Sequence, residues 1–144
     1  MEIPDRTPHV ATSFLMHNGK TLLFRRSGKV GTYKGKWAAV SGYIERYEQP
    51  YETAIKEILQ ETGIMARDIK LMNQGEIEVS DPELRIEWKI HTFLFETKTD
   101  KIKPNWESAE FRWVEPKKIE KMDTVPQLKE ALFGLLGKSG FGGS

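Results

Sequence analysis

The sequence GYIERYEQPYETAIKEILQETGI, residues 42–64, is the most informative segment of this chain. Pro50 suits the first turn of a helix, where its missing N–H costs little, and Gly63 suits a helix end. Between them lie apolar residues at the spacing of one helix face: Tyr51, Ala54, Ile55, Ile58 and Leu59. The segment therefore predicts a helix over residues 50–63 whose apolar face packs on a sheet.

The polar side of this helix carries Glu57, Gln60 and Glu61, at the i, i+3, i+4 spacing that places side chains on one face. The two carboxylates repel each other by roughly 0.2–0.5 kcal/mol, and a divalent cation between them would reverse that repulsion. Glutamate is also common on solvated helix faces. The helix alone is therefore compatible with a metal site or with an ordinary exposed face.

Apolar runs rich in β-favouring residues on both sides of this segment predict strands separated by turns. Asn18-Gly19 predicts a tight hairpin turn, and Ser41-Gly42 would break the third strand. The expected strands are Val10–His17, Thr21–Arg26, Trp37–Ile44, Ile69–Ser80, Leu84–Thr97 and Phe111–Val114, with a loop over Ser27–Lys36, a helical turn over Pro116–Lys121 and a terminal helix over Val125–Leu136. This mixture predicts an α+β or α/β domain with a mixed sheet and helices on its faces.

The composition limits the classes of protein. The length suits one domain over residues 1–144, with a flexible tail over residues 137–144. The chain has no cysteine, so a metal site would use oxygen or imidazole ligands, which favours Mg²⁺ or Mn²⁺. It shows neither a run of roughly 18 apolar residues nor a signal peptide. We expect a cytoplasmic protein without membrane contact. The pI near 7.9 gives little support to nucleic-acid recognition, so we expect no specific binding of nucleic acid.

Charge is distributed unevenly although the net charge is only +1. Residues 6–44 contain no Asp or Glu, and five glutamates follow between Glu45 and Glu61. Such neighbouring segments would bind an anion through a metal, or would simply be two solvated faces of opposite sign.

The spacing of residues 42–64 resembles the Nudix box. That box is Gly, five residues, Glu, seven residues, Arg-Glu, an apolar residue, any residue, Glu-Glu, any residue, Gly and an apolar residue. Gly42, Glu48 and residues 56–64 match every spacing, with Lys56 in place of the Arg and Gln60 in place of the first Glu of the pair. The chain is thus similar to Nudix hydrolases of the MutT type, and residues 37–44 and 107–114 resemble strands that flank the box.

The resemblance implies an α/β/α sandwich and a Mg²⁺-dependent enzyme that hydrolyses a diphosphate bond. Glu57 and Glu61 would bind the metal, and Glu57 would also be a candidate base. Glu48 would orient the helix or Lys56. Gly42 would permit a sharp turn and could offer its carbonyl oxygen to the metal.

The two departures from the box carry expectations of their own. Lys56 keeps the positive charge but lacks the planar fork of arginine, and it would pair with Glu52 or Glu48. Gln60 would coordinate only weakly, so one metal should bind less tightly, with a need for more Mg²⁺ or a preference for Mn²⁺. Glu107 is the expected ligand or base from outside the box, with Glu110 as the alternative and an ordinary surface role for Glu107 equally open.

The basic segment has a candidate role in binding the substrate. Four cations would grip the phosphates: Arg25, Arg26, Lys34 and Lys36. Arg25 and Arg26 alternate along a strand, so at most one of them should face the site. Three aromatic residues would stack on a base or, alternatively, pack in the core: Trp37, Phe24 and Trp106.

Three functions remain open at this point. The first is a nucleoside-triphosphate pyrophosphohydrolase, and the second is cleavage of ADP-ribose, a dinucleoside polyphosphate or a nucleotide sugar. The third is a non-catalytic module that binds nucleotides, which Gln60 favours and the two retained glutamates, Glu57 and Glu61, disfavour. In each case the expected partner is a nucleotide-like small molecule, and a homodimer is possible.

Overall fold

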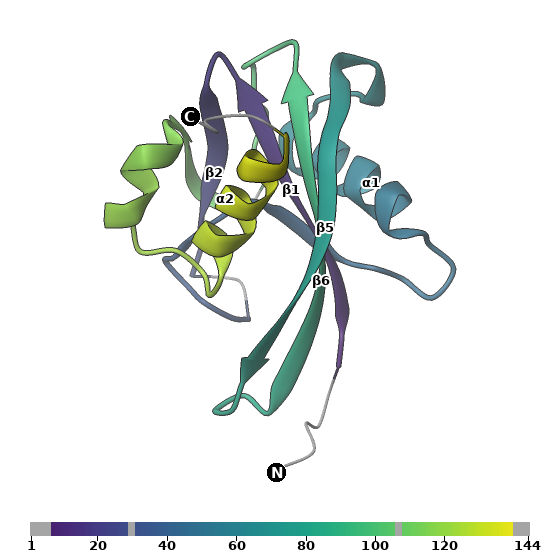
Figure 1. Cartoon of the computed structure of the whole chain (residues 1–144), viewed down its shortest axis with the longest axis vertical. Coiled ribbons are helices and arrows are strands. Elements are labelled where there is room, and N and C mark those ends of the chain that lie inside the picture. The colour runs from purple at the N-terminus through teal and green to yellow at the C-terminus, as the bar shows by residue number, and fades with distance from the viewer. Residues whose placement is uncertain (1–6, 29–30, 106–107, 140–144) are drawn as a thin grey trace.

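The computed structural model describes residues 7–28, 31–105 and 108–139. Within them, a seven-stranded mixed sheet lies between α1 on one face and α2 on the other, as predicted (Figure 1). The strands are β1 (His9–His17), β2 (Lys20–Arg26), β3 (Trp37–Ala38), β4 (Val40–Tyr43), β5 (Ile69–Asp81), β6 (Ile86–Thr97) and β7 (Ser108–Val114). The helices are α1 (Pro50–Thr62), α2 (Leu128–Ser139) and the short 3₁₀ helices η1 (Ala66–Asp68) and η2 (Pro116–Lys121).

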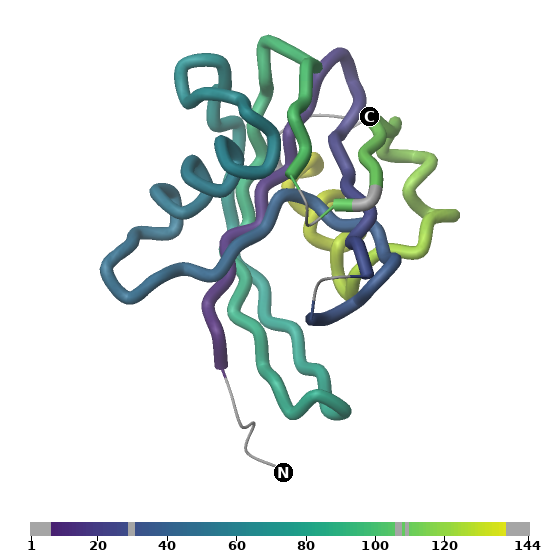
Figure 2. The backbone as a smooth tube through the Cα atoms, turned by 180° about the vertical axis from the view of Figure 1, so that it is seen from behind, coloured from purple at the N-terminus to yellow at the C-terminus, as the bar shows by residue number. Residues whose placement is uncertain are grey.

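The strand order is β3-β2-β1-β6-β5, with β4 also paired to β1 and β7 to β2. β1 and β6 run parallel, with His9 opposite Lys89, and the other described pairs are antiparallel. Asn18 and Gly19 have positive φ of 50° and 78°, which confirms the hairpin turn because such turns match the twist of their strands. The β5–β6 hairpin extends past the helices at one end of the sheet (Figure 2).

The strand expected over residues 37–44 is interrupted at Ala39, and not at Ser41-Gly42. β3 pairs with β2 while β4 pairs with β1, so the chain passes from one neighbouring strand to the other at Ala39. Ser41 and Gly42 continue the ladder with β1. The prediction was wrong because turn-forming residues were read from composition alone.

The terminal helix begins at Leu128, later than the predicted Val125. The backbone N–H of Val125 donates to the carbonyl oxygen of Trp37 at 2.9 Å, so it is committed to a tertiary contact. Gln127 has a positive φ of 65°, which a helix excludes. The start of α2 is therefore set by a contact with β3.

The helix α2 continues to Ser139, so the first part of the tail expected over residues 137–144 is helical. Residues 140–144 lie outside the described part of the chain. No helix among the described residues is long and apolar enough to cross a membrane.

Two apolar clusters hold the three layers together. On the α2 side, Phe14 and Leu94 of the sheet pack with Leu132. On the α1 side, Leu15 and Phe95 pack with Ala54, Ile58 and other residues. Alternate residues of β1 thus point to opposite faces, as a strand requires.

The buried face of α1 agrees with the predicted one at Ala54 and Ile58 and differs from it at Leu59. Leu59 is 49% exposed and Tyr51 is 45% exposed, whereas the helix buries Thr53, Ala54, Ile58, Glu61 and Thr62. The two threonines tolerate burial because their hydroxyl groups donate to nearby acceptors, as from Thr62 to the carbonyl oxygen of Ile58 at 2.6 Å. Counting only apolar residues therefore misplaced the face.

Candidate functional site

The site begins with the fixed ends of α1. The Glu52 carboxylate accepts a hydrogen bond from the backbone N–H of Gln49 at 3.0 Å, and Pro50 occupies the first turn. At the other end, Gly63 adopts a left-handed φ of 79° and donates its N–H to the carbonyl oxygen of Leu59. Local sequence thus determines where this helix starts and stops.

Glu48 ties the preceding loop to the helix. Its Oε2 accepts from Lys56 Nζ at 2.5 Å, and its Oε1 accepts from Thr53 Oγ1 and from the backbone N–H of Glu45, both at 3.0 Å. The Lys56 hydrogen bond is the main cause that lowers the pKa of Glu48, and the same bond raises the pKa of Lys56. Of the two partners expected for Lys56, the structure selects Glu48.

Gly42 provides space for Glu57. A β-carbon at Gly42 would lie 2.7 Å from Glu57 Oε1 and closer still to the Cγ and Cδ atoms. Gly42 lies within extended β4 and makes no sharp turn, which corrects that expectation. A glycine at this position therefore lets the half-buried Glu57 carboxylate rest directly on the strand.

The three polar residues of the box helix do not share one environment. Glu57 and Gln60 line a cavity, as expected, and Gln60 is exposed. Glu61 is buried, at 9% exposure, so it does not meet the expectation that all three side chains project together into solvent or a cleft. The side of α1 that faces the sheet includes Glu61 and leaves Leu59 exposed, so it is turned about the helix axis relative to the predicted side.

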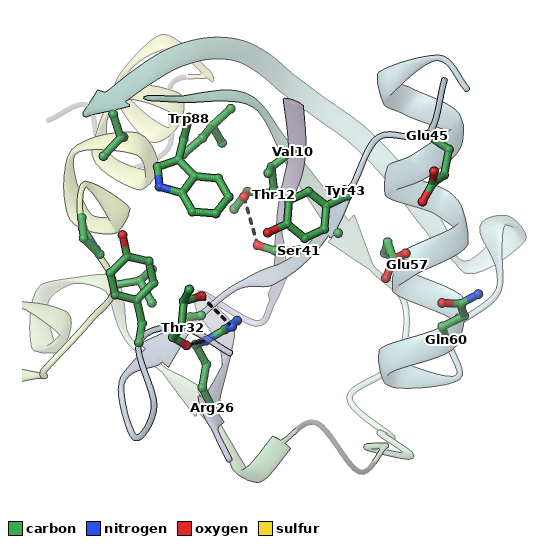
Figure 3. Close-up of a pocket in the computed structure, with 17 residues that line it drawn as sticks. Val10, Thr12, Arg26, Thr32, Ser41, Tyr43, Glu45, Glu57, Gln60 and Trp88 are labelled. Carbon is green, nitrogen blue, oxygen red and sulfur yellow. Dashed lines mark hydrogen bonds between the residues drawn. The ribbon is translucent and has the colours of Figure 1, made fainter. Parts of the chain in front are cut away.

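The cavity has a volume of about 360 Å³ and runs from α1 across the end of β4 to the aromatic residue Trp88 of β6 (Figure 3). Glu57, Gln60 and Glu45 lie at one end. Trp88 and Arg26 lie at the other end (Figure 3). The cavity thus joins an acidic end to an aromatic end that carries one cation.

The expected phosphate-binding cations are mostly engaged elsewhere. Arg25 Nε lies 3.0 Å from a Glu110 oxygen, and Lys36 Nζ lies 2.8 Å from Asp123. Lys34 is exposed on the loop. Three of the expected phosphate-binding cations therefore do not line the cavity: Arg25, Lys34 and Lys36. Glu110, the alternative ligand from outside the box, does not line it either, because it pairs with Arg25.

Arg26 is the expected cation that lines the cavity, which agrees with the alternation of Arg25 and Arg26 along β2. Its Nε donates to the carbonyl oxygen of Thr32 at 2.8 Å, and its Nη2 donates to Thr32 Oγ1 at 3.3 Å. These bonds fix the guanidinium at the cavity wall.

The aromatic candidates for base stacking are core residues, which was the stated alternative. Trp37 is 8% exposed, with the Arg112 guanidinium 5.0 Å from its ring, and Phe24 is 3% exposed. Trp106 and Glu107 lie outside the described residues. Stacking by Trp37 or Phe24 is therefore excluded by their burial.

A family model described as the NUDIX domain matches residues 7–133, which is most of the chain. The chain belongs to the Nudix family. The m7GpppN-mRNA hydrolase NUDT17 of Xenopus laevis is 31% identical over 85 residues, covering 58% of this chain and 29% of that protein. This Nudix chain thus spans less than a third of that relative's length.

Solved structures resemble this Nudix chain over nearly its full length. The MutT protein of Methanosarcina mazei Go1 is 26% identical, with a TM-score of 0.69 over 93% of this chain and 94% of that one. A C. elegans Ap4A hydrolase has a TM-score of 0.76 over 95% of this chain and 99% of that one, at 14% identity. At that identity the second likeness concerns the fold alone.

The donor set at the acidic end suits a hard cation of the kind expected for a Nudix box. Glu57 and Gln60 present oxygen atoms to the cavity, and Glu61 lies one turn away. Among the described residues, no group of three or more His, Asp or Glu side chains is gathered as at a metal centre. The Glu57 and Gln60 oxygen atoms at the cavity would suit Mg²⁺ or Mn²⁺, which bind few protein oxygens together with phosphate and water.

Sequence reasoning missed most of the far end of the Nudix cavity, including Trp88, Tyr33 and the Thr12–Ser41 hydroxyl pair. These residues belong to separate strands and a loop. The strand assignments of Thr12, Ser41 and Trp88 were available as a signal, but they do not show which residues of different strands lie opposite one another.

Proposed function

We propose that this Nudix chain is a metal-dependent pyrophosphohydrolase that cleaves the diphosphate bond of a nucleotide-like substrate. The observation that supports it is Glu57, which rests on Gly42 and lines a cavity whose other end is aromatic. Such a cavity accommodates a phosphate chain and a flat group in one molecule. Family membership and the hydrolase named NUDT17 agree with this activity.

Each box residue has a separate task in this proposal. A bound divalent cation supplies charge neutralisation at phosphorus and a more acidic water. Glu57 at the cavity wall and the buried Glu61 one helical turn along would hold that cation, with a weaker contribution from the Gln60 amide oxygen. A Glu57 carboxylate oxygen would be the candidate to accept the proton of the attacking water. Glu48 and Lys56 keep α1 at a constant angle to the preceding loop.

A mononucleotide derivative fits better than a dinucleoside compound. The volume of about 360 Å³ lies near the lower end of the range for small-molecule sites. One base with its ribose and a diphosphate would fill it. We therefore favour a nucleoside tri- or diphosphate, or a nucleoside-diphosphate conjugate whose second group lies outside the cavity.

A non-catalytic binding module is the second candidate, because Gln60 lacks the charge of the box glutamate. A screen of phosphate and diphosphate release across nucleotides, with Mg²⁺ and with Mn²⁺, separates the two. Hydrolysis that disappears in Glu57→Gln and persists in Glu130→Gln would support the enzyme, because Glu130 is an exposed glutamate on α2. Nucleotide binding without turnover under every condition would support the binding module.

A further inference from the structure

The end of the cavity opposite Glu57 is built from aromatic side chains. Trp88 of β6 lies at this end, and Tyr43 of β4 lies between Trp88 and Glu57 (Figure 3). The ring centroids of Trp88 and Tyr43 are 6.1 Å apart and their planes are tilted by 31°. Tyr33 lines the same end from the loop after β2. Aromatic faces with apolar surroundings suit a flat heteroaromatic ring, since stacking on such a face stabilises any of the nucleobases.

This aromatic wall is held in place by a chain of polar contacts. Tyr33 donates its hydroxyl proton to Asp81 Oδ2 at 2.9 Å, and Asp81 Oδ1 accepts from the backbone N–H of Leu84 at 3.2 Å. Burial, followed by the contact with Asp81, raises the pKa of Tyr33 to about 12, while the nearby Trp88 side chain opposes the shift. The phenol thus remains protonated, and able to donate, throughout the neutral range.

The opposite wall carries hydrogen-bond donors. Arg26 faces the cavity across from Trp88, and the Thr12 and Ser41 hydroxyl groups, 3.0 Å apart, lie between them (Figure 3). Of the described residues that line the cavity, the charged ones are Arg26 at this end and Glu45 and Glu57 at the other. The two ends therefore differ in charge, and the aromatic end is the one with the cation.

We propose that the aromatic end is a nucleobase subsite in which Trp88 stacks on the base and Arg26 donates to a carbonyl group on its edge. The inference rests on the proposed function, since it assumes that the diphosphate lies at the Glu57 end. It assigns Arg26 to the base, and no longer to the phosphates as the sequence suggested.

The substrate class follows from the chemistry of Arg26. A guanidinium has five N–H donors and no acceptor, and Thr32 engages donors on Nε and Nη2. Guanine and uracil present a carbonyl oxygen where adenine and cytosine present an amino group. An amino group facing Arg26 would set donor against donor and leave both unpaired, which is unfavourable in a confined site. The subsite should thus prefer a base with a carbonyl edge.

The test is nucleotide binding to Glu57→Gln, in the absence of metal, measured by calorimetry with GMP against AMP and UMP against CMP. We expect GMP and UMP to bind about tenfold more tightly than their amino counterparts. Arg26→Met should abolish this preference, and Trp88→Ala should weaken binding of all four. Trp113→Ala is the control, because its indole donates to the Asp100 carbonyl oxygen on another part of the fold. Equal affinities within both pairs would overturn the inference.

Catalysis provides a second measurement that separates this inference from the proposed function. In the active enzyme, Trp88→Phe and Trp88→Ala should raise KM for nucleotides progressively and leave KM for ribose 5-diphosphate, which has no base, unchanged. Turnover with the same KM in every variant would refute the subsite and leave the proposed function intact. Base-selective binding without any turnover would support the subsite and refute the enzyme. Thermal melting identifies a variant that fails to fold, and the wild-type base series then decides alone.

Discussion

The contact between Gly42 and Glu57 makes a sharp prediction about Gly42→Ala. The new β-carbon would lie 2.7 Å from Glu57 Oε1, which is far inside van der Waals contact, so the carboxylate must leave β4. Overpacking of this kind costs about 1–3 kcal/mol, and we expect a value near 1 because the Glu57 side chain can rotate. The effect on turnover should be larger, about a hundredfold, because a displacement of roughly 1 Å at a reacting group has that size.

The assay combines thermal or denaturant unfolding with the initial rate of diphosphate cleavage. Gly28→Ala is the matched control, since a β-carbon there meets nothing within 4 Å. A double-mutant cycle with Glu57→Ala tests the cause directly, because removing the glutamate should also remove the stability cost of Gly42→Ala. The reasoning is refuted if Gly42→Ala is as active as the wild type, or if its stability cost is the same when Glu57 is absent.

Three further predictions follow from the other contacts of the site. Gln60→Glu should lower the Mg²⁺ concentration needed for half-maximal activity, and an unchanged metal titration would contradict the assigned role. Because Lys56 lowers the pKa of Glu48, the pair stabilises the fold at pH values above the ordinary pKa of a glutamate, and this stabilisation is lost as the pH falls through the lowered value. Lys56→Met should therefore reduce the loss of stability at acid pH, measured by unfolding at a series of pH values. An unchanged dependence of stability on acid pH would count against the pair. Tyr33→Phe should cost about 1 kcal/mol of stability at neutral pH by breaking the bond to Asp81; equal stability of the two proteins in unfolding curves at neutral pH would contradict it.

The elements that could be predicted are those with local causes. The helix α1 was expected over residues 50–63, because Pro50 suits the first turn of a helix and Gly63 suits the left-handed conformation at its end. The β1–β2 turn was expected for the same reason, since Asn18 and Gly19 tolerate a positive φ. The box spacing also assigned the family, which the match over residues 7–133 confirms.

The errors concern contacts between elements. The buried face of α1 was misjudged because Thr53 and Thr62 can be buried once their hydroxyl groups are bonded, and an apolar count does not include them. For Trp37 the sequence left base stacking and core packing open, and the structure places it in the cluster on the α2 side. Neither outcome is visible in the spacing of residues along the chain.

Spacing along the chain was sufficient for α1, its caps, the hairpin and the box, because each lies within one continuous segment of the sequence. The cavity depended on how β1, β4 and β6 pair and on where the loop after β2 returns, since Thr12, Ser41, Trp88 and Tyr33 meet only in that register. Strand register is set by the burial of whole faces, so it was decided by packing across the domain.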